Sequence, residues 1–84
     1  MYYFYILRCV DRSLYCGITT DLERRVQEHN SATAKAAKYT RAKQPVILVY
    51  SEEYPSLSSA LKREAEVKRW TKIRKERLIN PDIL

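Results

Sequence analysis

The chain has 84 residues, 45% of them hydrophobic, with one Gly and three Pro. This length predicts one domain with a small core, and the composition excludes a disordered or collagen-like chain. Sixteen Lys and Arg residues outnumber ten Asp and Glu residues, which gives a formal net charge of +6. The positive charge favours a polyanionic partner, nucleic acid first, although many small proteins are basic without such a partner.

We expect a cytoplasmic protein with reduced thiols. The sequence opens on a strand-like segment without the basic and apolar regions of a secretory leader. No run approaches the roughly 18 apolar residues of a membrane helix. Cys9 and Cys16 are the two cysteines and His29 is the sole histidine, a set too small to predict structural zinc.

The first half of the chain predicts a hairpin followed by a helix. Residues 2–9 and 14–19 are rich in aromatic and β-branched side chains, which favours two strands joined by residues 10–13, a connection without the Gly of a common hairpin turn. Thr20 and Glu23 have the spacing of a capping box, so a helix is expected from there to about Asn30 or Ser31. The small and basic residues 31–44 predict a mobile or short-helical surface connection.

The second half predicts a strand and a helix. Pro45 precedes the short β-branched run from Val46 to Tyr50, which is typical of a buried third strand. Ser56 or Ser58 is expected to cap a helix that carries apolar residues at helical spacing and ends near Trp70.

A short basic helix is expected over roughly residues 72–79. The order of elements is then β-β-α-β-α-α. It predicts an α+β fold, a small three-stranded antiparallel or mixed sheet flanked by helices. We expect this single domain to span residues 1–84, with a core of about 2–79.

The first helix has cationic residues on its apolar face. Leu22 and Val26 define the inward stripe, and Arg25 and His29 fall on the same side. Cations on such a stripe are costly unless they line a cleft or are paired, so these two are candidates for function. The alternative is an Arg that extends its charge to water and a hydrogen-bonded His at the edge of the stripe.

The second helix repeats this pattern with an acid. If Leu57 is the centre of its apolar face, Glu64 lies on that face between Leu61 and Val67. Lys68 follows four residues later, so an exposed ion pair worth roughly 0.3–0.5 kcal/mol explains the pair without any function. The alternative is a carboxylate held at the sheet surface to bind a divalent metal.

The pleat of the strands divides the tyrosines between the two faces of the predicted sheet. Tyr3 and Tyr5 share one face of the first strand, and Tyr15 shares a face with Gly17 on the second. The only Gly inside a strand suggests close approach by another backbone or a ligand. A phenol is a poor base at its usual pKa of about 10, but a neighbouring guanidinium or metal would favour the phenolate. Packing in the sheet is the alternative role for each Tyr.

Five short segments follow one another in a fixed order. They are Tyr3-Phe4-Tyr5, Tyr15-Cys16-Gly17, Thr20-Asp21-Leu22-Glu23-Arg24-Arg25 with His29, Ala37-Lys38-Tyr39-Thr40-Arg41 and Ala60-Leu61-Lys62-Arg63-Glu64. Together they resemble the GIY-YIG nuclease superfamily, and more closely its small UPF0213 group, over roughly residues 2–79. Tyr3 and Phe4 stand where the superfamily has Gly and Ile, as is usual in the small group, and Cys16 stands where it has Ile.

The resemblance implies a metal-dependent endonuclease that hydrolyses nucleic-acid phosphodiester bonds in repair or DNA processing, with DNA favoured over RNA. Glu64 would hold one Mg²⁺ or Mn²⁺. Tyr15 would act as the general base and Tyr5 would orient the water or the phosphate. Arg25 would stabilise charge on the phosphate in the transition state, and His29 would assist proton transfer or position Tyr5.

The resemblance also implies contacts with the nucleic-acid backbone. The residues assigned to these contacts are Lys38, Tyr39, Arg41, Lys68 and Lys72, while Gly17 has a structural role at the site. The alternative function is a nucleic-acid-binding module that keeps the nuclease scaffold without cutting, or that acts only beside a targeting partner protein.

Overall fold

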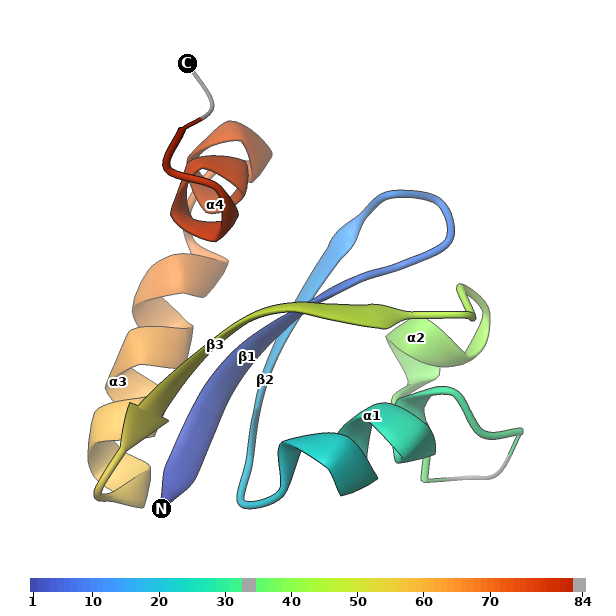
Figure 1. Cartoon of the computed structure of the whole chain (residues 1–84), viewed down its shortest axis with the longest axis horizontal. Coiled ribbons are helices and arrows are strands. Elements are labelled where there is room, and N and C mark those ends of the chain that lie inside the picture. Colours follow the sequence, from blue (N-terminus) through green and yellow to red (C-terminus); the bar gives the residue numbers. More distant parts are fainter. Residues whose placement is uncertain (33–34, 83–84) are drawn as a thin grey trace.

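A three-stranded antiparallel sheet lies at the centre of the fold (Figure 1). The computed structural model describes residues 1–32 and 35–82. The central strand β1 (Tyr2–Arg8) pairs with β2 (Leu14–Thr19) on one side and with β3 (Ile47–Tyr54) on the other. The sheet predicted as antiparallel or mixed is therefore antiparallel throughout.

Helices lie on both sides of the sheet, and each face has its own apolar cluster. α1 (Leu22–His29) and the short α2 (Lys38–Arg41) lie on one side, and α3 (Leu57–Lys68) and α4 (Lys72–Ile79) lie on the other (Figure 1). The cluster on the α3 side contains Phe4, Ile6, Cys16 and Val67, and the cluster on the α1 side contains Tyr5, Leu7, Cys9 and Val46. The alternation predicted from the pleat of β1 is confirmed.

The hairpin turns through residues 9–13 without a Gly. The Cys9 N–H donates to the Ser13 carbonyl at 2.9 Å, and the Arg12 N–H donates to the Cys9 carbonyl at 2.9 Å. Arg12 takes a left-handed conformation, with φ of 71°, which costs a non-Gly residue about 1 kcal/mol. The Asp11 carboxylate accepts from the Ser13 N–H at 3.0 Å and supports the turn.

The start of α1 differs from the prediction by one residue. Asp21, rather than Thr20, is the N-cap, because its carboxylate accepts from the Arg24 N–H at 3.1 Å. A carboxylate at this position also interacts favourably with the positive end of the helix dipole. The expected connection 31–44 contains α2, and its residues 33–34 lie outside the described part of the chain.

The third strand is longer and more exposed than predicted. Instead of a buried run over Val46–Tyr50, β3 occupies an edge of the sheet and extends to Tyr54. Val46 is buried just before the strand, but Ile47 is 59% exposed and Leu48 is 39% exposed. An edge strand has a neighbour on one side only, so its apolar residues are less completely covered.

The buried face of α3 also differs from the predicted one. Leu57 and Leu61 are about half exposed, whereas Ala60 and Val67 are fully buried. The small Ala60 side chain permits close packing of α3 on the sheet. Glu64 falls between the two buried positions, so it does lie on the inward stripe, as predicted.

The remaining helix predictions are confirmed. Ser56, one of the two predicted caps, accepts from the Ser59 N–H at 3.1 Å, and α4 spans the expected residues 72–79. The Arg63 guanidinium donates to both carboxylate oxygens of Glu52, at 2.9 and 3.0 Å, and so ties α3 to β3. Within the described residues, no helix is long and apolar enough to span a membrane.

Candidate active site

The only Gly of the chain makes room for the Tyr5 side chain. Tyr5 on β1 and Gly17 on β2 are direct partners in the sheet. A Cβ atom at position 17 would lie 2.3 Å from the Tyr5 Oη atom and 2.5 Å from its Cζ atom, which is closer than packed atoms approach. The close approach predicted at Gly17 is therefore made by a neighbouring side chain, and not by another backbone or a ligand.

Behind Gly17, three buried side chains form a line of hydrogen bonds. The Tyr5 hydroxyl lies 2.9 Å from His29 Nε2 on α1. The other ring nitrogen, Nδ1, lies 2.7 Å from the Thr40 hydroxyl on α2, which donates to the Ala37 carbonyl at 3.1 Å. Tyr5 is 2% exposed, and His29 and Thr40 are fully buried. The inward position predicted for His29 is confirmed, and the contact joins three elements.

Burial keeps both ends of the Tyr5–His29 contact neutral near pH 7. Burial, together with the positive charge of Arg25, lowers the pKa of His29 to about 4. Burial raises the pKa of Tyr5 to about 12, although the Arg25 guanidinium beside the hydroxyl acts in the opposite direction. A neutral imidazole beside a neutral phenol is therefore the ground state of the site.

Tyr15 lies at the open side of this cluster. Its ring meets the edge of the His29 ring at a centroid distance of 5.2 Å and stacks on Tyr39 at 5.7 Å. Tyr15 is half-buried and Tyr39 is 42% exposed. The Tyr15 hydroxyl makes no hydrogen bond to any residue in the described part of the chain. Of the two predicted catalytic phenols, Tyr15 is therefore the one that solvent or substrate reaches.

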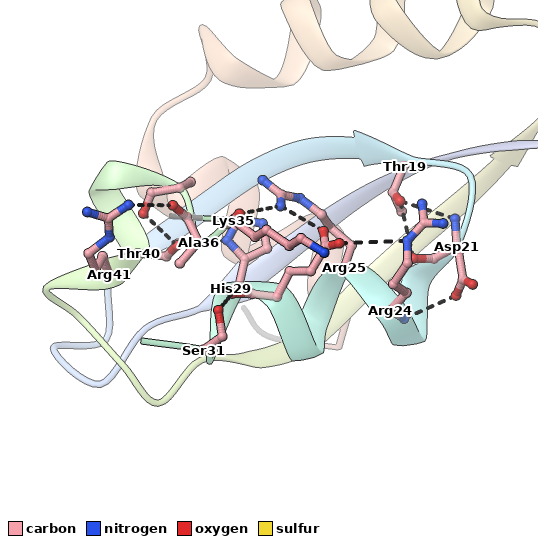
Figure 2. Close-up of polar contacts among 12 residues, drawn as sticks. Thr19, Asp21, Arg24, Arg25, His29, Ser31, Lys35, Ala36, Thr40 and Arg41 are labelled. Atoms are coloured by element: carbon pink, nitrogen blue, oxygen red, sulfur yellow. Dashed lines mark hydrogen bonds and ion pairs between the residues drawn. The ribbon is translucent and has the colours of Figure 1, made fainter. Parts of the chain in front are cut away.

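Arg25 is held by contacts from its own helix and from the connection that follows (Figure 2). Its Nη1 atom donates to the Glu28 carboxylate at 3.0 Å and to the Lys35 carbonyl at 2.8 Å. The Arg25 side chain is 25% exposed. The guanidinium is therefore fixed in place while part of it stays open to solvent, as a group that binds an anion requires.

Glu64 is separated from this cluster by the sheet. It lies on α3, which packs on the opposite face, and its carboxylate is 3.3 Å from the Lys68 Nζ atom. The side chain is 19% exposed. Its negative charge is the smallest of the contributions that raise the pKa of Tyr5. Both predicted features of Glu64, the ion pair with Lys68 and the position on the inward face of α3, are therefore present.

The donor set of the site fits a weakly held divalent ion. Among residues 1–32 and 35–82, no group of three or more His, Cys, Asp and Glu side chains could enclose a metal. Mg²⁺ in nucleic-acid enzymes is often bound through one or two carboxylates, with water and substrate phosphate as its other ligands. The single, partly exposed carboxylate of Glu64 is compatible with such an ion and not with a closed structural site.

The basic residues predicted to contact nucleic acid fall into two groups. They are Lys38, Tyr39 and Arg41 on α2, and Lys68 and Lys72 at the junction of α3 and α4. All five side chains are exposed. The two groups lie on opposite sides of the sheet (Figure 1), and only the α2 group adjoins the tyrosine cluster, through the stack of Tyr39 on Tyr15.

The structure therefore brings most of the predicted site together. The residues that meet are Tyr5, Tyr15, Gly17, Arg25, His29 and Tyr39. One member was missed, because Thr40 stands in a basic tract and was not assigned a role. Thr40 lies in α2, a helix of four residues, which is too short for helical spacing to predict its buried face.

The structure is thus an α+β domain with a Tyr, Arg and His cluster on the α1 side of the sheet and the Glu64 carboxylate on α3, on the other side. Residues 1–77 match the family model described as the GIY-YIG catalytic domain. The chain belongs to the GIY-YIG nuclease superfamily, and within it to the UPF0213 family.

Two relatives and one solved structure support this assignment. The UPF0213 protein NP_0776A of Natronomonas pharaonis is 47% identical over 93% of this chain and 89% of its own length. The UPF0213 protein HQ_3675A of Haloquadratum walsbyi is 51% identical over 92% of this chain and 84% of its own. The solution NMR structure of the UPF0213 protein BH0048 from Bacillus halodurans is 43% identical, with a TM-score of 0.61 over 98% of this chain and 86% of that one.

Proposed function

We propose that the chain is a metal-dependent endonuclease that hydrolyses phosphodiester bonds of DNA and works as one domain. The observation that carries the proposal is the cluster of Tyr5, His29 and Arg25 beneath the open Tyr15. Buried polar groups lower stability unless they are hydrogen-bonded, and a polar line in so small a core is the kind of local inconsistency that marks functional sites. Membership in a nuclease superfamily, whose members generally use a divalent metal, supports the same conclusion.

The proposed roles follow from exposure and charge. Tyr15, in its phenolate form, accepts a proton from the attacking water, because its hydroxyl is on the open side of the cluster. Arg25 stabilises the negative charge that grows on the phosphate. Tyr5 and His29 are buried behind these two groups and position them, as the edge contact of the His29 ring with both tyrosine rings supports.

Glu64 is the residue that would hold the divalent ion, Mg²⁺ or Mn²⁺. When bound, such an ion supplies Lewis-acid polarisation of a phosphate oxygen and stabilisation of the leaving oxygen. Lys68 neutralises part of the Glu64 charge across 3.3 Å. A divalent ion would therefore compete with Lys68 for the Glu64 carboxylate. This competition favours binding of the ion together with the substrate, whose phosphate supplies further ligands.

The exposed cations provide the affinity for the DNA backbone. Lys38 and Arg41 flank Tyr39 on α2, next to Tyr15, so they are positioned to hold phosphates near the point of cutting. Lys68 and Lys72 are assigned to more distant phosphates. Such contacts carry no sequence information and weaken as salt rises.

Incubation of the purified protein with end-labelled DNA and RNA, in Mg²⁺, Mn²⁺ or EDTA, tests the proposal. We expect cutting of DNA that requires the metal and is lost in Glu64→Gln and in Tyr15→Phe. Glu66→Gln, a more exposed acid on the same helix, is the matched control and should cut normally. Binding of DNA without any cutting, equal in all variants, would favour the alternative of a non-catalytic binding module.

A further inference from the structure

A line of contacts runs through the candidate active site from α1 to the backbone of α2. The Arg25 guanidinium interacts with the Tyr5 hydroxyl, which lies 2.9 Å from His29 Nε2. His29 Nδ1 lies 2.7 Å from the Thr40 hydroxyl, and Thr40 reaches the Ala37 carbonyl at 3.1 Å. The carbonyl at the Thr40 end gives a direction to the protons along this line.

At the Thr40 end the terminal acceptor is a carbonyl, which cannot donate. We assign the single proton of the Thr40 hydroxyl to the Ala37 carbonyl, which lies 3.1 Å from it. The Thr40 oxygen can then only accept from the other side, so His29 Nδ1 carries the ring proton. A neutral imidazole with a proton on Nδ1 has a free lone pair on Nε2, which accepts from the Tyr5 hydroxyl.

The positive charge of Arg25 beside Tyr5 agrees with this assignment. A guanidinium only donates, so the Tyr5 oxygen is the acceptor in its interaction with Arg25. The Tyr5 proton then needs a different acceptor, and His29 Nε2 is the group in place. If Nε2 carried the proton instead, two donors would face the Tyr5 oxygen and its own proton would be left without a partner.

We propose that Thr40 is a positioning residue that holds His29 as the Nδ1–H tautomer and thereby orients Tyr5 and Arg25 toward the substrate. This inference rests on the proposed function for its catalytic consequence. All donors along the line point the same way, from Arg25 to the Ala37 carbonyl. Chains of this kind are strengthened because each hydrogen bond polarises the next. Thr40 itself touches neither substrate nor metal.

Removal of the Thr40 hydroxyl reverses the direction of the hydrogen bond between His29 and Tyr5. In Thr40→Val the buried Nδ1–H has no acceptor, so the ring moves its proton to Nε2, where Tyr5 can accept it. The Tyr5 proton must then point elsewhere, toward the guanidinium of Arg25. The Tyr5 hydroxyl and the Arg25 guanidinium are then two donors that face each other, which displaces Arg25 from its place beside the phosphate. The methyl group that replaces the Thr40 hydroxyl preserves the shape of the core.

The tautomer is measured directly by NMR. His29 is the sole histidine of the chain, so a long-range ¹H–¹⁵N correlation spectrum of the imidazole contains one ring only. We expect a protonated Nδ1 and an unprotonated Nε2 in the wild type and in Thr40→Ser, and a protonated Nε2 in Thr40→Val. A protonated Nε2 in the wild type, or an unchanged ring in Thr40→Val, overturns the inference. The wild-type spectrum decides this even if Thr40→Val fails to fold.

Kinetics test the positioning role. We expect kcat to fall by about 10- to 100-fold in Thr40→Val, within the range for a misplaced catalytic group, with KM nearly unchanged and activity restored in Thr40→Ser. Normal kcat in a folded Thr40→Val whose tautomer has changed would refute the positioning role. A wild type that never cuts, but shows the Nδ1–H tautomer, would refute the nuclease proposal and leave the tautomer assignment intact.

Discussion

On the α1 side of the sheet the largest buried side chains include polar ones, whereas on the α3 side they are apolar. The polar set is Tyr5, His29 and Thr40, and the apolar set is Phe4, Ile6 and Val67. Among the described residues, every buried side-chain nitrogen or oxygen has a hydrogen-bond partner. The polar face is therefore fully satisfied, but it depends on each member of the line, since one loss leaves a buried group unpaired.

Polar contacts on the α3 side lie at the rim instead of the centre. Arg63 binds Glu52 on β3, and Arg8 binds both oxygens of Glu76 on α4 at 2.7 Å. These four side chains are 19–25% exposed. This face attaches helices to the sheet through apolar burial and partly exposed ion pairs. The comparison predicts that substitutions in the polar α1-side cluster change activity, and also stability where they disturb its packing or protonation, whereas substitutions in the apolar α3-side cluster change stability alone.

The largest expected effect is on the α1 side, at Arg25. We predict that Arg25→Met lowers the cutting rate by about 10²–10³-fold, because a preorganised cation beside the phosphate is lost. Arg24→Met is the matched control, since Arg24 is on the same helix but more exposed, and it should cut nearly normally. Single-turnover cutting of labelled DNA measures both. Equal losses in the two variants would mean that the charge acts only through general affinity.

Gly17→Ala should be among the most destabilising substitutions in the chain. The new methyl group would lie 2.3 Å from the Tyr5 Oη atom, and such overpacking typically costs about 1–3 kcal/mol or more. Urea unfolding monitored by circular dichroism measures the change. In a Tyr5→Ala background the same substitution should cost much less, because the ring that it meets is gone. An equal cost in both backgrounds would show that Tyr5 does not cover Gly17.

His29 should make the fold sensitive to mild acid. Its pKa falls from the ordinary 6.5 to about 4 on folding, so between these pH values the unfolded chain binds a proton that the folded chain excludes. Stability is therefore fully present above pH 6.5 and declines as the pH falls to about 4, by up to about 3 kcal/mol. Urea unfolding at a series of pH values measures this. His29→Gln should lose the slope above pH 5, and retention of the slope would assign it to another group.

The sequence predicted the polar face well, because its residues follow regular local spacing. Tyr5 and Tyr15 follow the pleat of their strands, and Arg25 and His29 recur at helical intervals on α1. The partner of His29 could not be predicted in this way, since Thr40 is 11 residues away in the chain and on another helix. The fit of Tyr5 over Gly17 depends on cross-strand register, which spacing within one strand does not determine.

Prediction from local pattern failed on the apolar face for a different reason. The large side chains of Leu57 and Leu61 suggested the contact surface of α3, but helix packing is closest at a small residue, here Ala60. The prediction of the α1 N-cap failed because of a similar local ambiguity. Thr20 and Asp21 are adjacent, and both residue types suit an N-cap position. Such near-equal choices are decided by tertiary packing.

The smallest expected effect distinguishes the two candidate faces of α3. Val67→Ala removes buried methyl groups from the cluster with Phe4 and Ile6, and it should lower the free energy of unfolding by about 2 kcal/mol. Leu61→Ala removes more atoms, yet Leu61 is 48% exposed, so the loss should stay within about 0.5 kcal/mol. Both folded variants should cut at the wild-type rate. A larger loss for Leu61 than for Val67 would restore the leucine stripe as the buried face of α3.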